Sequence, residues 1–422
     1  ARRQHPRRAS VASRRGCLTV TMPTSSEVSD YQWLVSPAAR EALRDAANSE
    51  LPLHQLATEL RKEHSPSRTS LVLDQRELRE RARDKFALSA DMYFTRVALQ
   101  QATDQWVAAY KAQRFSGFEN VGDVCTGIGG DLLALAAVAQ AAGIDMSPVA
   151  TILAQANLSA NSRSAQVVLG QASPDFVAPL DAWHADPDRR PTGRRTSIVE
   201  QHSPDAAVLD TMLRANPNAA IKLSPASAAP VAWQQQAELE WVSRARECRQ
   251  QVAWFGALAG HAGARRATRL DAQGAVVGSF VGAPNTPADW GEELGDYLYE
   301  PDPAVLAASL QGALAAGLNL PSVAREVAYF TSCQRIDHPL LTRFRVMERL
   351  PSLRLKSVAA HLRERGVGRL EIKHRGWRLD PEQFRKQLNL RGDNSAVLVV
   401  YPHLSRPLGV VVEREDSEPP VR

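Results

Sequence analysis

The spacing of apolar residues changes along the chain and divides it into regions. In residues 27–115, apolar positions recur at helical spacing, as Ala39, Leu43 and Ala46 illustrate. In residues 116–282, short apolar runs alternate with helical stretches. The first pattern predicts an N-terminal helical region, and the second predicts an α/β domain built on a doubly wound parallel sheet.

The strands of this sheet are expected at six short apolar runs, residues 121–124, 141–145, 166–169, 182–185, 219–223 and 266–270. Helices are expected between them, starting at Leu132 and covering residues 148–159, 206–215 and 233–258. The last and longest helix is inferred from the helical spacing of Trp241, Cys248 and Phe255. Residues 275–281 are expected to close the sheet as an antiparallel strand.

The last part of the chain has a different organisation. Residues 283–339 begin with a stretch rich in Pro, Gly, Asn and Asp, and we expect a linker followed by a helix over 304–318. Residues 340–422 show a β-α-β-α-β-β succession, with strands at 345–348, 369–374, 396–401 and 408–414 and helices at 355–365 and 381–388. This succession predicts a small, separate α+β domain.

A glycine-rich turn joins the first predicted strand to the helix that follows it, in the sequence NVGDVCTGIGGD at 120–131. Gly127 and Gly129 allow the backbone to approach a ligand, and the helix start offers free N–H groups. The dinucleotide fingerprint G-x-G-x-x-G would need a glycine where Leu132 stands. Asp123 instead suits a cationic ligand such as S-adenosylmethionine, which carries an ammonium and a sulfonium; a tight turn without a ligand is the alternative.

A second acid follows the next predicted strand. Asp145 lies about 20 residues beyond the glycines, where ribose hydroxyls are held in doubly wound folds. A helix cap before Pro148 is the alternative role. The two motifs DVCTGIGGD, at 123–131, and GIDMSP, at 143–148, resemble the first two motifs of class I S-adenosylmethionine-dependent methyltransferases.

More narrowly, the chain resembles bacterial methyltransferases with a C-terminal THUMP-like domain, from Tyr31 to Arg414. This resemblance implies a class I methyltransferase sheet, a THUMP-like fold for residues 340–422 and an association with RNA. It also implies that S-adenosylmethionine is the cofactor and that the helix before the first strand, with Thr95 and Arg96, lies near the methionine end of the cofactor. The cofactor residues that it implies are Asp123, Gly127, Gly129, Asp145 and Met146.

Asp186 and Pro187 follow the fourth predicted strand, at the sheet edge where open α/β sheets bind ligands. Relatives that methylate amino groups have Asp or Asn, two prolines and an aromatic residue here. This chain keeps Asp186 and Pro187 as candidate catalytic residues, but Asp188 and Arg189 replace the second proline and the aromatic residue. The departure weakens an assignment to adenine N6, and leaves a carboxylate able to accept a proton or hydrogen bond from a nucleophile.

Candidate substrate-binding residues surround this motif. Arg189, Arg190 and Arg194 lie in a loop-like stretch, and arginine matches phosphate geometry; pairing with nearby acids is the alternative. Lys222, in the fifth predicted strand, is expected either to face the cleft or to pair with Asp186 or Asp188.

Charge is unevenly distributed along the 422 residues, whose formal net charge is +5. Residues 1–21 hold six arginines and no acid, and residues 340–422 hold 17 basic against 10 acidic residues. Basic ends around an acidic middle favour a polyanionic partner. Residues 1–26 are predicted to be a disordered basic tail, which we interpret as a targeting segment, a nucleic-acid arm, or untranslated sequence ahead of Met22.

The four cysteines lie far apart, without a C-x-x-C pair. Their spacing argues against a disulfide framework and a structural metal, and favours a reducing, cytoplasmic location. Cys125, beside the glycine turn, is interpreted as a packed small residue rather than a nucleophile. No apolar run approaches the ~18 residues of a membrane span, so no membrane association is expected.

These patterns favour an S-adenosylmethionine-dependent methyltransferase that acts on a base nitrogen of RNA. Two alternatives stay open. The same cofactor site could serve a small molecule or a protein, or the chain could bind cofactor and RNA without turnover, as the missing Pro-aromatic pair suggests. A nicotinamide dehydrogenase is disfavoured by Leu132 and by the lack of an evident hydride-transfer constellation.

Overall fold

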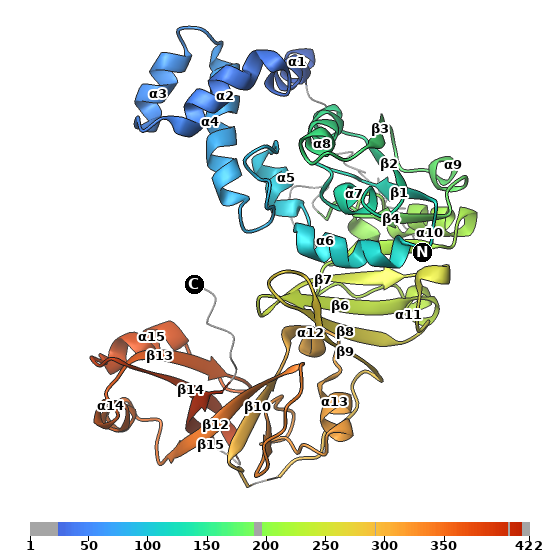
Figure 1. Ribbon diagram of the computed structural model, residues 1–422. Helices are drawn as coiled ribbons and strands as arrows, with labels where there is room; N and C mark the ends of the chain where they lie inside the picture. Colours follow the sequence, from blue (N-terminus) through green and yellow to red (C-terminus); the bar gives the residue numbers. More distant parts are fainter. Residues whose placement is uncertain (1–23, 190–195, 292, 404–405, 416–422) are drawn as a thin grey trace, which may run out of the picture.

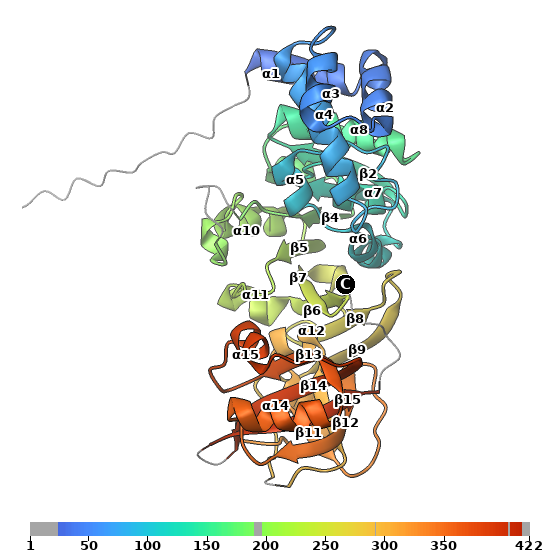
Figure 2. The same ribbon diagram turned by 90° about the vertical axis from the view of Figure 1, so that its left-hand side faces the viewer.

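The computed structural model describes residues 24–189, 196–291, 293–403 and 406–415. Within these ranges the molecule has three parts, with helices at one end, a nine-stranded sheet in the middle and a six-stranded sheet at the other end (Figures 1 and 2). Residues 1–23 of the predicted basic tail lie outside the described residues. The first helix begins at Ser25, inside the segment predicted to be a tail.

The N-terminal region is helical, as predicted. Its main helices are α1 (Ser25–Leu34), α2 (Arg40–Asn48), α3 (Leu53–Leu60), α4 (Pro66–Arg81), α5 (Arg96–Gln101) and α6 (Gln105–Ala112). The longest, α4, starts at a Ser65 cap with Pro66 in its first turn. Its buried Gln75 exchanges two hydrogen bonds with the backbone of Phe94, at 2.7 and 2.9 Å, and so fixes the segment that leads into α5.

The central sheet has the strand order β3-β2-β1-β4-β5-β7-β6-β8-β9. Five neighbouring strands are parallel, β3 (Ala165–Leu169), β2 (Gln140–Asp145), β1 (Asn120–Val124), β4 (Ala182–Ala185) and β5 (Ala219–Leu223). The helices α7 (Gly130–Leu135), α8 (Pro148–Ala160), α9 (Pro174–Val177) and α10 (Ala206–Ala215) connect them. The doubly wound prediction is confirmed, and the strand order reverses beside β1, where such sheets bind ligands.

The helix predicted over residues 233–258 is wrong. The chain forms a short helix α11 (Val231–Gln236) and then a hairpin of β6 (Glu238–Arg244) and β7 (Glu247–Trp254), which turns through Ala245 and Arg246 at positive φ. All seven residues of β6 are buried, including two glutamates, so the strand has no polar side facing solvent.

Residues 275–281 close the sheet as an antiparallel edge strand, as expected, although the antiparallel neighbour of β5 is β7. That segment forms β9 (Val276–Gly282), which pairs with β8 (Arg265–Leu270) at the edge of the sheet.

The second sheet has the order β11-β10-β12-β15-β14-β13. Four of its strands and two helices fall in the predicted α+β domain, β12 (Leu341–Leu350), α14 (Leu355–Glu364), β13 (Val367–His374), α15 (Pro381–Leu388), β14 (Asn394–His403) and β15 (Arg406–Arg414). The other two, β10 (Tyr297–Pro301) and β11 (Phe330–Ser332), come from the segment expected to be a linker. The helix expected over 304–318 is divided at Ser309, with φ +59°, into α12 (Pro303–Ala307) and α13 (Gln311–Gly317).

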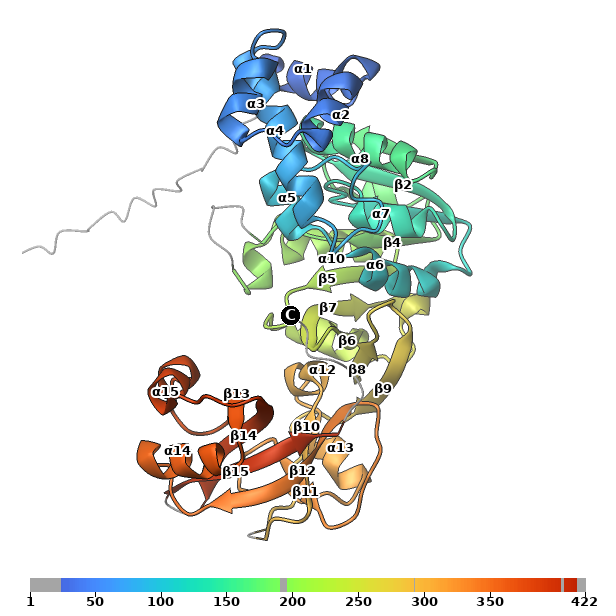
Figure 3. The same ribbon diagram turned by 60° about the vertical axis from the view of Figure 1, so that its left-hand side comes forward.

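The two sheets share one hydrophobic core. The helix α12 packs against β6, β7 and β8 of the first sheet and follows directly from β10 of the second (Figure 3). Trp241 and Ala267 of the first sheet belong to the same buried cluster as Leu314, Phe330 and Leu341. The α+β domain has hydrophobic clusters of its own, but Leu340 and Leu341 at its start belong to the cluster of the first sheet, so removing the domain would expose part of the central core.

We expect Leu314→Ala to destabilise the whole molecule. Leu314 is 1% exposed in the shared core, and loss of a buried leucine costs about 2–5 kcal/mol in cavity and transfer terms. Urea unfolding followed by tryptophan fluorescence measures the change in the free energy of unfolding. Leu53→Ala, at a residue 57% exposed on α3, is the matched control and should change it little. A change for Leu314→Ala as small as that of the control would contradict a shared core.

Candidate active site

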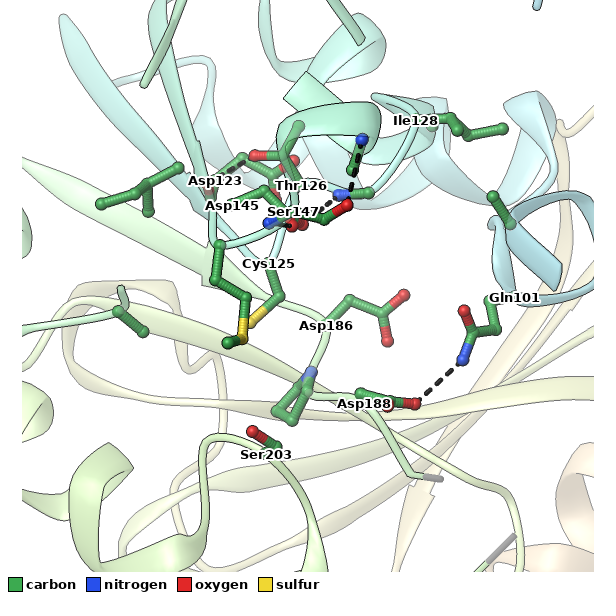
Figure 4. Close-up of a pocket in the computed structure, with 18 of the residues that line it drawn as sticks. Gln101, Asp123, Cys125, Thr126, Ile128, Asp145, Ser147, Asp186, Asp188 and Ser203 are labelled. Carbon is green, nitrogen blue, oxygen red and sulfur yellow. Dashed lines mark hydrogen bonds between the residues drawn. The ribbon is translucent and has the colours of Figure 1, made fainter. Parts of the chain in front are cut away.

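A cavity of about 580 Å³ lies at the carboxyl ends of β1, β2 and β4 and is closed on one side by α5 and the residues after it. The sequence-predicted residues Asp123, Gly127, Asp145 and Met146 all line it. Asp186, Pro187 and Arg189 line it from the β4 side (Figure 4). The structure thus brings the predicted cofactor and catalytic residues to one cavity, with the exception of Gly129.

The glycine turn has two glycines with different roles. Gly127 has φ +57°, and a Cβ added there would meet no atom within 4 Å, so its backbone faces open cavity. Gly129 has φ +87°, and its Cβ would lie 3.6 Å from Ala154 of α8. Gly127 therefore admits a ligand to the backbone, while Gly129 gives the left-handed conformation from which α7 starts.

Asp145 reaches across from β2 to this turn. Its carboxylate accepts hydrogen bonds from the Gly127 and Ser147 N–H groups, both at 2.8 Å. The side chain that caps α8 is Ser147, which accepts from Ala150 N–H at 3.2 Å, so Asp145 is not a simple helix cap. Burial raises the pKa of Asp145 above its usual value, although the two N–H groups oppose that change.

Asp123 lies at the end of β1 with its carboxylate buried below the cavity. Its Oδ1 is 2.8 Å from His184 Nδ1, on the paired residue of β4. Its Oδ2 has no hydrogen-bond partner among the described residues. Burial raises the pKa of Asp123, against the lowering effect of His184. A buried acceptor oxygen at the cavity matches a cationic donor.

Several residues at the site were missed by the sequence interpretation. Beyond His184, the side chains of Lys111, Asp131 and Thr103 extend the contacts of Asp123 below the cavity. Asp131 directly follows the double glycine, which was a local signal. The positions of His184 and Lys111 depend on strand register and on the docking of α6, which the sequence does not display.

Asp186 and Lys222 form an ion pair at the β4 side of the cavity. Lys222 Nζ lies 2.5 Å from Asp186 Oδ2, which selects the pairing alternative for this lysine. Gln101, at the end of α5, points toward Asp186 across the cavity and donates to Asp188 Oδ1 at 2.9 Å (Figure 4). The sequence interpretation did not single out Gln101, which the structure places at the site.

Other predicted positions have different outcomes. Thr95 caps α5 and lines the cavity, while Arg96 is paired with Asp74 at 2.7 Å and with Glu77 at 2.8 Å and is not a lining residue. Arg190 and Arg194 lie outside the described residues.

The thiol beside the glycine turn is not set up as a nucleophile. Burial raises the pKa of Cys125 well above its usual value. The thiol rather than the thiolate is therefore the stable form, which supports the interpretation of Cys125 as a packed residue.

The strand order and the cavity define the arrangement of class I S-adenosylmethionine-dependent methyltransferases. The chain is 32% identical over 335 residues to uncharacterized S-adenosylmethionine-dependent methyltransferases of Mycobacterium tuberculosis strains CDC 1551 and H37Rv, covering 76% of this chain and 84% of theirs. The chain belongs to this methyltransferase family. Residues 341–414 match the THUMP domain-like family, and residues 27–82 match a domain of unknown function, DUF8688.

A solved structure shares the whole architecture. A crystal structure described as a methyltransferase from Porphyromonas gingivalis W83 aligns with a TM-score of 0.73 at 18% identity. The alignment covers 94% of this chain and all of that one, and it supports the fold. In the parts of the chain that the structure describes, no cluster of His, Cys, Asp and Glu residues is arranged to hold a metal ion, and no helix is long and apolar enough to cross a membrane.

The residues at the cavity fit S-adenosylmethionine, the cofactor of this family. The unpartnered Asp123 Oδ2 suits the ammonium, and the open space at Gly127 leaves room beside the backbone. Asp145 lines the same cavity and would hold the ribose. When bound, the cofactor supplies an electrophilic methyl group, and the protein has to align the acceptor with it.

We expect Gly127→Val to weaken S-adenosylmethionine binding by about tenfold or more, because the added side chain enters the cavity at a backbone position with φ +57°. Isothermal titration calorimetry measures the affinity, and thermal unfolding confirms that the variant is folded. Gly117→Val is the matched control, since its Cβ also meets no atom within 4 Å but lies outside the cavity. Unchanged affinity in folded Gly127→Val would exclude this cavity as the cofactor site.

Proposed function

We propose that this methyltransferase transfers a methyl group to a base nitrogen of RNA. The observation that carries the proposal is the position of Asp186 and Pro187 at the cavity end of β4, next to the cofactor residues. A nucleophilic nitrogen that enters here would meet a carboxylate that can accept its N–H hydrogen bond. The aromatic residue of amino-methylating relatives is replaced by Arg189, so base stacking would need another side chain.

The ion pair with Lys222 gives Asp186 a defined orientation. With Oδ2 held by Lys222 Nζ, the carboxylate can orient an N–H group of the acceptor and its lone pair toward the methyl group. Lys222 Nζ also lies 3.4 Å from the backbone oxygen of Gln101, so the same lysine joins the catalytic carboxylate to the wall of the cavity. A base within a duplex would have to be unpaired or flipped to reach this position.

The THUMP-like match supports RNA as the partner, since THUMP domains are associated with RNA. Some basic residues of this domain are engaged in ion pairs within the protein and are not assigned to RNA contact. Lys373 and Arg375, near Gly376, are both paired with Glu300 of β10, at 2.7 and 3.1 Å. Arg378, Arg385 and Lys386 are exposed and make no ion pair among the described residues, so we assign phosphate contact to them.

Beside the cavity, Arg189 is the proposed phosphate contact, and Arg190 and Arg194 extend this proposal along the same loop. A cytoplasmic location is part of the proposal. A small-molecule or protein substrate, or binding without turnover, are the alternatives that the following experiments separate.

We expect Asp186→Asn to reduce methyl transfer by about 10²-fold or more while S-adenosylmethionine affinity stays nearly unchanged. The substitution keeps the shape of the side chain but weakens its acceptor and breaks the Lys222 ion pair. Single-turnover transfer of labelled methyl to total RNA from a strain lacking the enzyme measures the effect, and mass spectrometry of the digested RNA names the nucleoside.

The matched control is Asp175→Asn, at an exposed residue of α9 outside the cavity. Full transfer by folded Asp186→Asn would remove its catalytic role. No transfer by the wild-type protein to RNA, but transfer to a protein or small-molecule fraction, would replace RNA as the substrate. No transfer to any fraction would favour the binding protein without turnover.

We expect Arg378→Ala, Arg385→Ala and Lys386→Ala together to weaken RNA binding at all sequences tested. Each lost phosphate contact should lower the slope of log affinity against log salt by about 0.7–1. Fluorescence anisotropy with one labelled RNA at several salt concentrations measures both quantities. Arg44→Ala, Arg61→Ala and Lys62→Ala in the N-terminal helices form the control set, and equal slopes for the two triple variants would contradict the assignment.

A further inference from the structure

Four ionisable side chains form a continuous chain below the cofactor cavity, which we call the buried chain. Asp123 Oδ1 lies 2.8 Å from His184 Nδ1, His184 Nε2 lies 3.0 Å from Lys111 Nζ, and Lys111 Nζ lies 2.7 Å from Asp131 Oδ1. All four side chains are less than 10% exposed. They come from β1, β4, α6 and α7, so the chain joins four elements.

The chemistry of these contacts fixes the direction of each hydrogen bond. An ammonium only donates, so His184 Nε2 accepts from Lys111, and Nδ1 therefore carries the hydrogen that is donated to Asp123. Thr103 Oγ1 donates to Asp131 Oδ2 at 2.8 Å. A second proton on His184 would place an N–H group against the Lys111 ammonium, which disfavours it.

Asp131 favours the charged form of Lys111. Burial is the larger effect and lowers the pKa of Lys111, and Asp131 partly offsets it. Burial also opposes the charge of Asp131, but the Lys111 ammonium attracts and hydrogen-bonds the carboxylate, and the pKa of Asp131 is lowered. The Lys111 and Asp131 charges balance, which leaves the negative charge of ionised Asp123. This residue lines the cavity, and its buried Oδ2 has no hydrogen-bond partner among the described residues.

We propose that His184 and Lys111 are positioning residues for the cofactor, and that cofactor binding is linked to the release of a proton from the buried chain. Lys111 donates to His184 Nε2, and His184 Nδ1 holds Oδ1 of Asp123 so that Oδ2 receives the ammonium of S-adenosylmethionine. The inference concerns the cofactor end of the site and does not depend on the identity of the methyl acceptor.

The negative charge of Asp123 decides how cofactor affinity changes with pH. Burial raises the pKa of Asp123, so the Asp123–His184 pair takes up a proton at a higher pH than an exposed aspartate would. That proton and the ammonium compete for the same negative charge. Cofactor affinity is therefore highest at pH values above the pKa of the Asp123–His184 pair. Below that pKa, the affinity falls by up to about tenfold per pH unit.

Several other charged groups lie near the Asp123–His184 pair. His184 on β4 faces Asp123 of β1, Lys111 of α6 and Asp131 of α7. Lys222 of β5 and Asp186, which form their own ion pair, also act on Lys111. Asp145 lines the same cavity and its pKa is also raised by burial, so the experiment must separate it from Asp123.

Two ligands make that separation. S-adenosylhomocysteine carries the amino-acid end, with its ammonium, whereas 5′-methylthioadenosine has the adenosine part without it. Protonation of Asp145 changes the affinity for both ligands. Protonation of Asp123 changes only the affinity for S-adenosylhomocysteine, because only this ligand carries the ammonium. Calorimetry between about pH 5.5 and pH 7.5, where the α-amino group is protonated, gives the affinity of each. Repeating the calorimetry in buffers of different ionisation enthalpy gives the number of protons that are released on binding.

We expect the ratio of the S-adenosylhomocysteine affinity to the 5′-methylthioadenosine affinity to fall as the pH falls. We also expect proton release on binding of S-adenosylhomocysteine alone. Lys111→Met should move the fall to higher pH, because it removes a positive charge that lowers the pKa of Asp123. His184→Gln keeps a donor for Asp123 but cannot take up a proton, and should move the fall to lower pH.

Lys62→Met, at an exposed lysine of the N-terminal region, is the matched control and should reproduce the wild-type profile. Equal pH profiles for the two ligands in the wild-type protein, with no excess proton release for S-adenosylhomocysteine, would overturn the proposal. This measurement needs no variant, so it stands even if substitution of a buried residue prevents folding. Profiles of folded Lys111→Met and His184→Gln that match the wild type would also overturn it.

Discussion

Burial of charge constrains the structure around α6 more than any other interaction. The helix carries Lys111 into the buried chain. Tyr110, next to it, and Arg114, just after the helix, reach the fully buried glutamates of β6 at 2.5 to 3.1 Å. An isolated buried charge is costly, so neither set of partners is stable without the helix. The N-terminal region is therefore anchored to the sheet by ionic contacts, and α5, which closes the cavity, is held with it.

Local features were predictable from the sequence, and long-range ones were not. The glycine turn, Asp123 and Asp145 lie within 23 residues of one another, and strand-end chemistry indicated their roles. The β6–β7 hairpin was missed because its glutamates are paired with Arg114 and Arg266, residues that are far away in sequence. His184 and Gln101 were missed as site residues for the same reason, since register and docking bring them to the cavity.

The boundary near residue 340 shows a related limit. Turn-forming residues before it were typical of a linker, yet β10 and β11 from this segment complete the second sheet. Polar contacts also cross between the sheets. Ser243 of β6 donates to Asp302, the cap of α12, at 2.5 Å, and Arg265 of β8 donates to the Ala308 backbone oxygen at 3.1 Å. A sequence pattern indicates where turns occur. It does not indicate which hydrophobic core the residues next to those turns pack into.

The shared core also constrains the distance between the cavity and the second sheet. Among the described residues, one buried cluster joins the two sheets, so the sheet that carries the exposed basic residues of α15 packs against the sheet that carries Asp186. For an RNA substrate, this geometry makes the protein a molecular ruler. The nucleotide that reaches the cavity would be chosen by its distance from the docked segment of the RNA, measured through the RNA fold, as much as by the identity of its base.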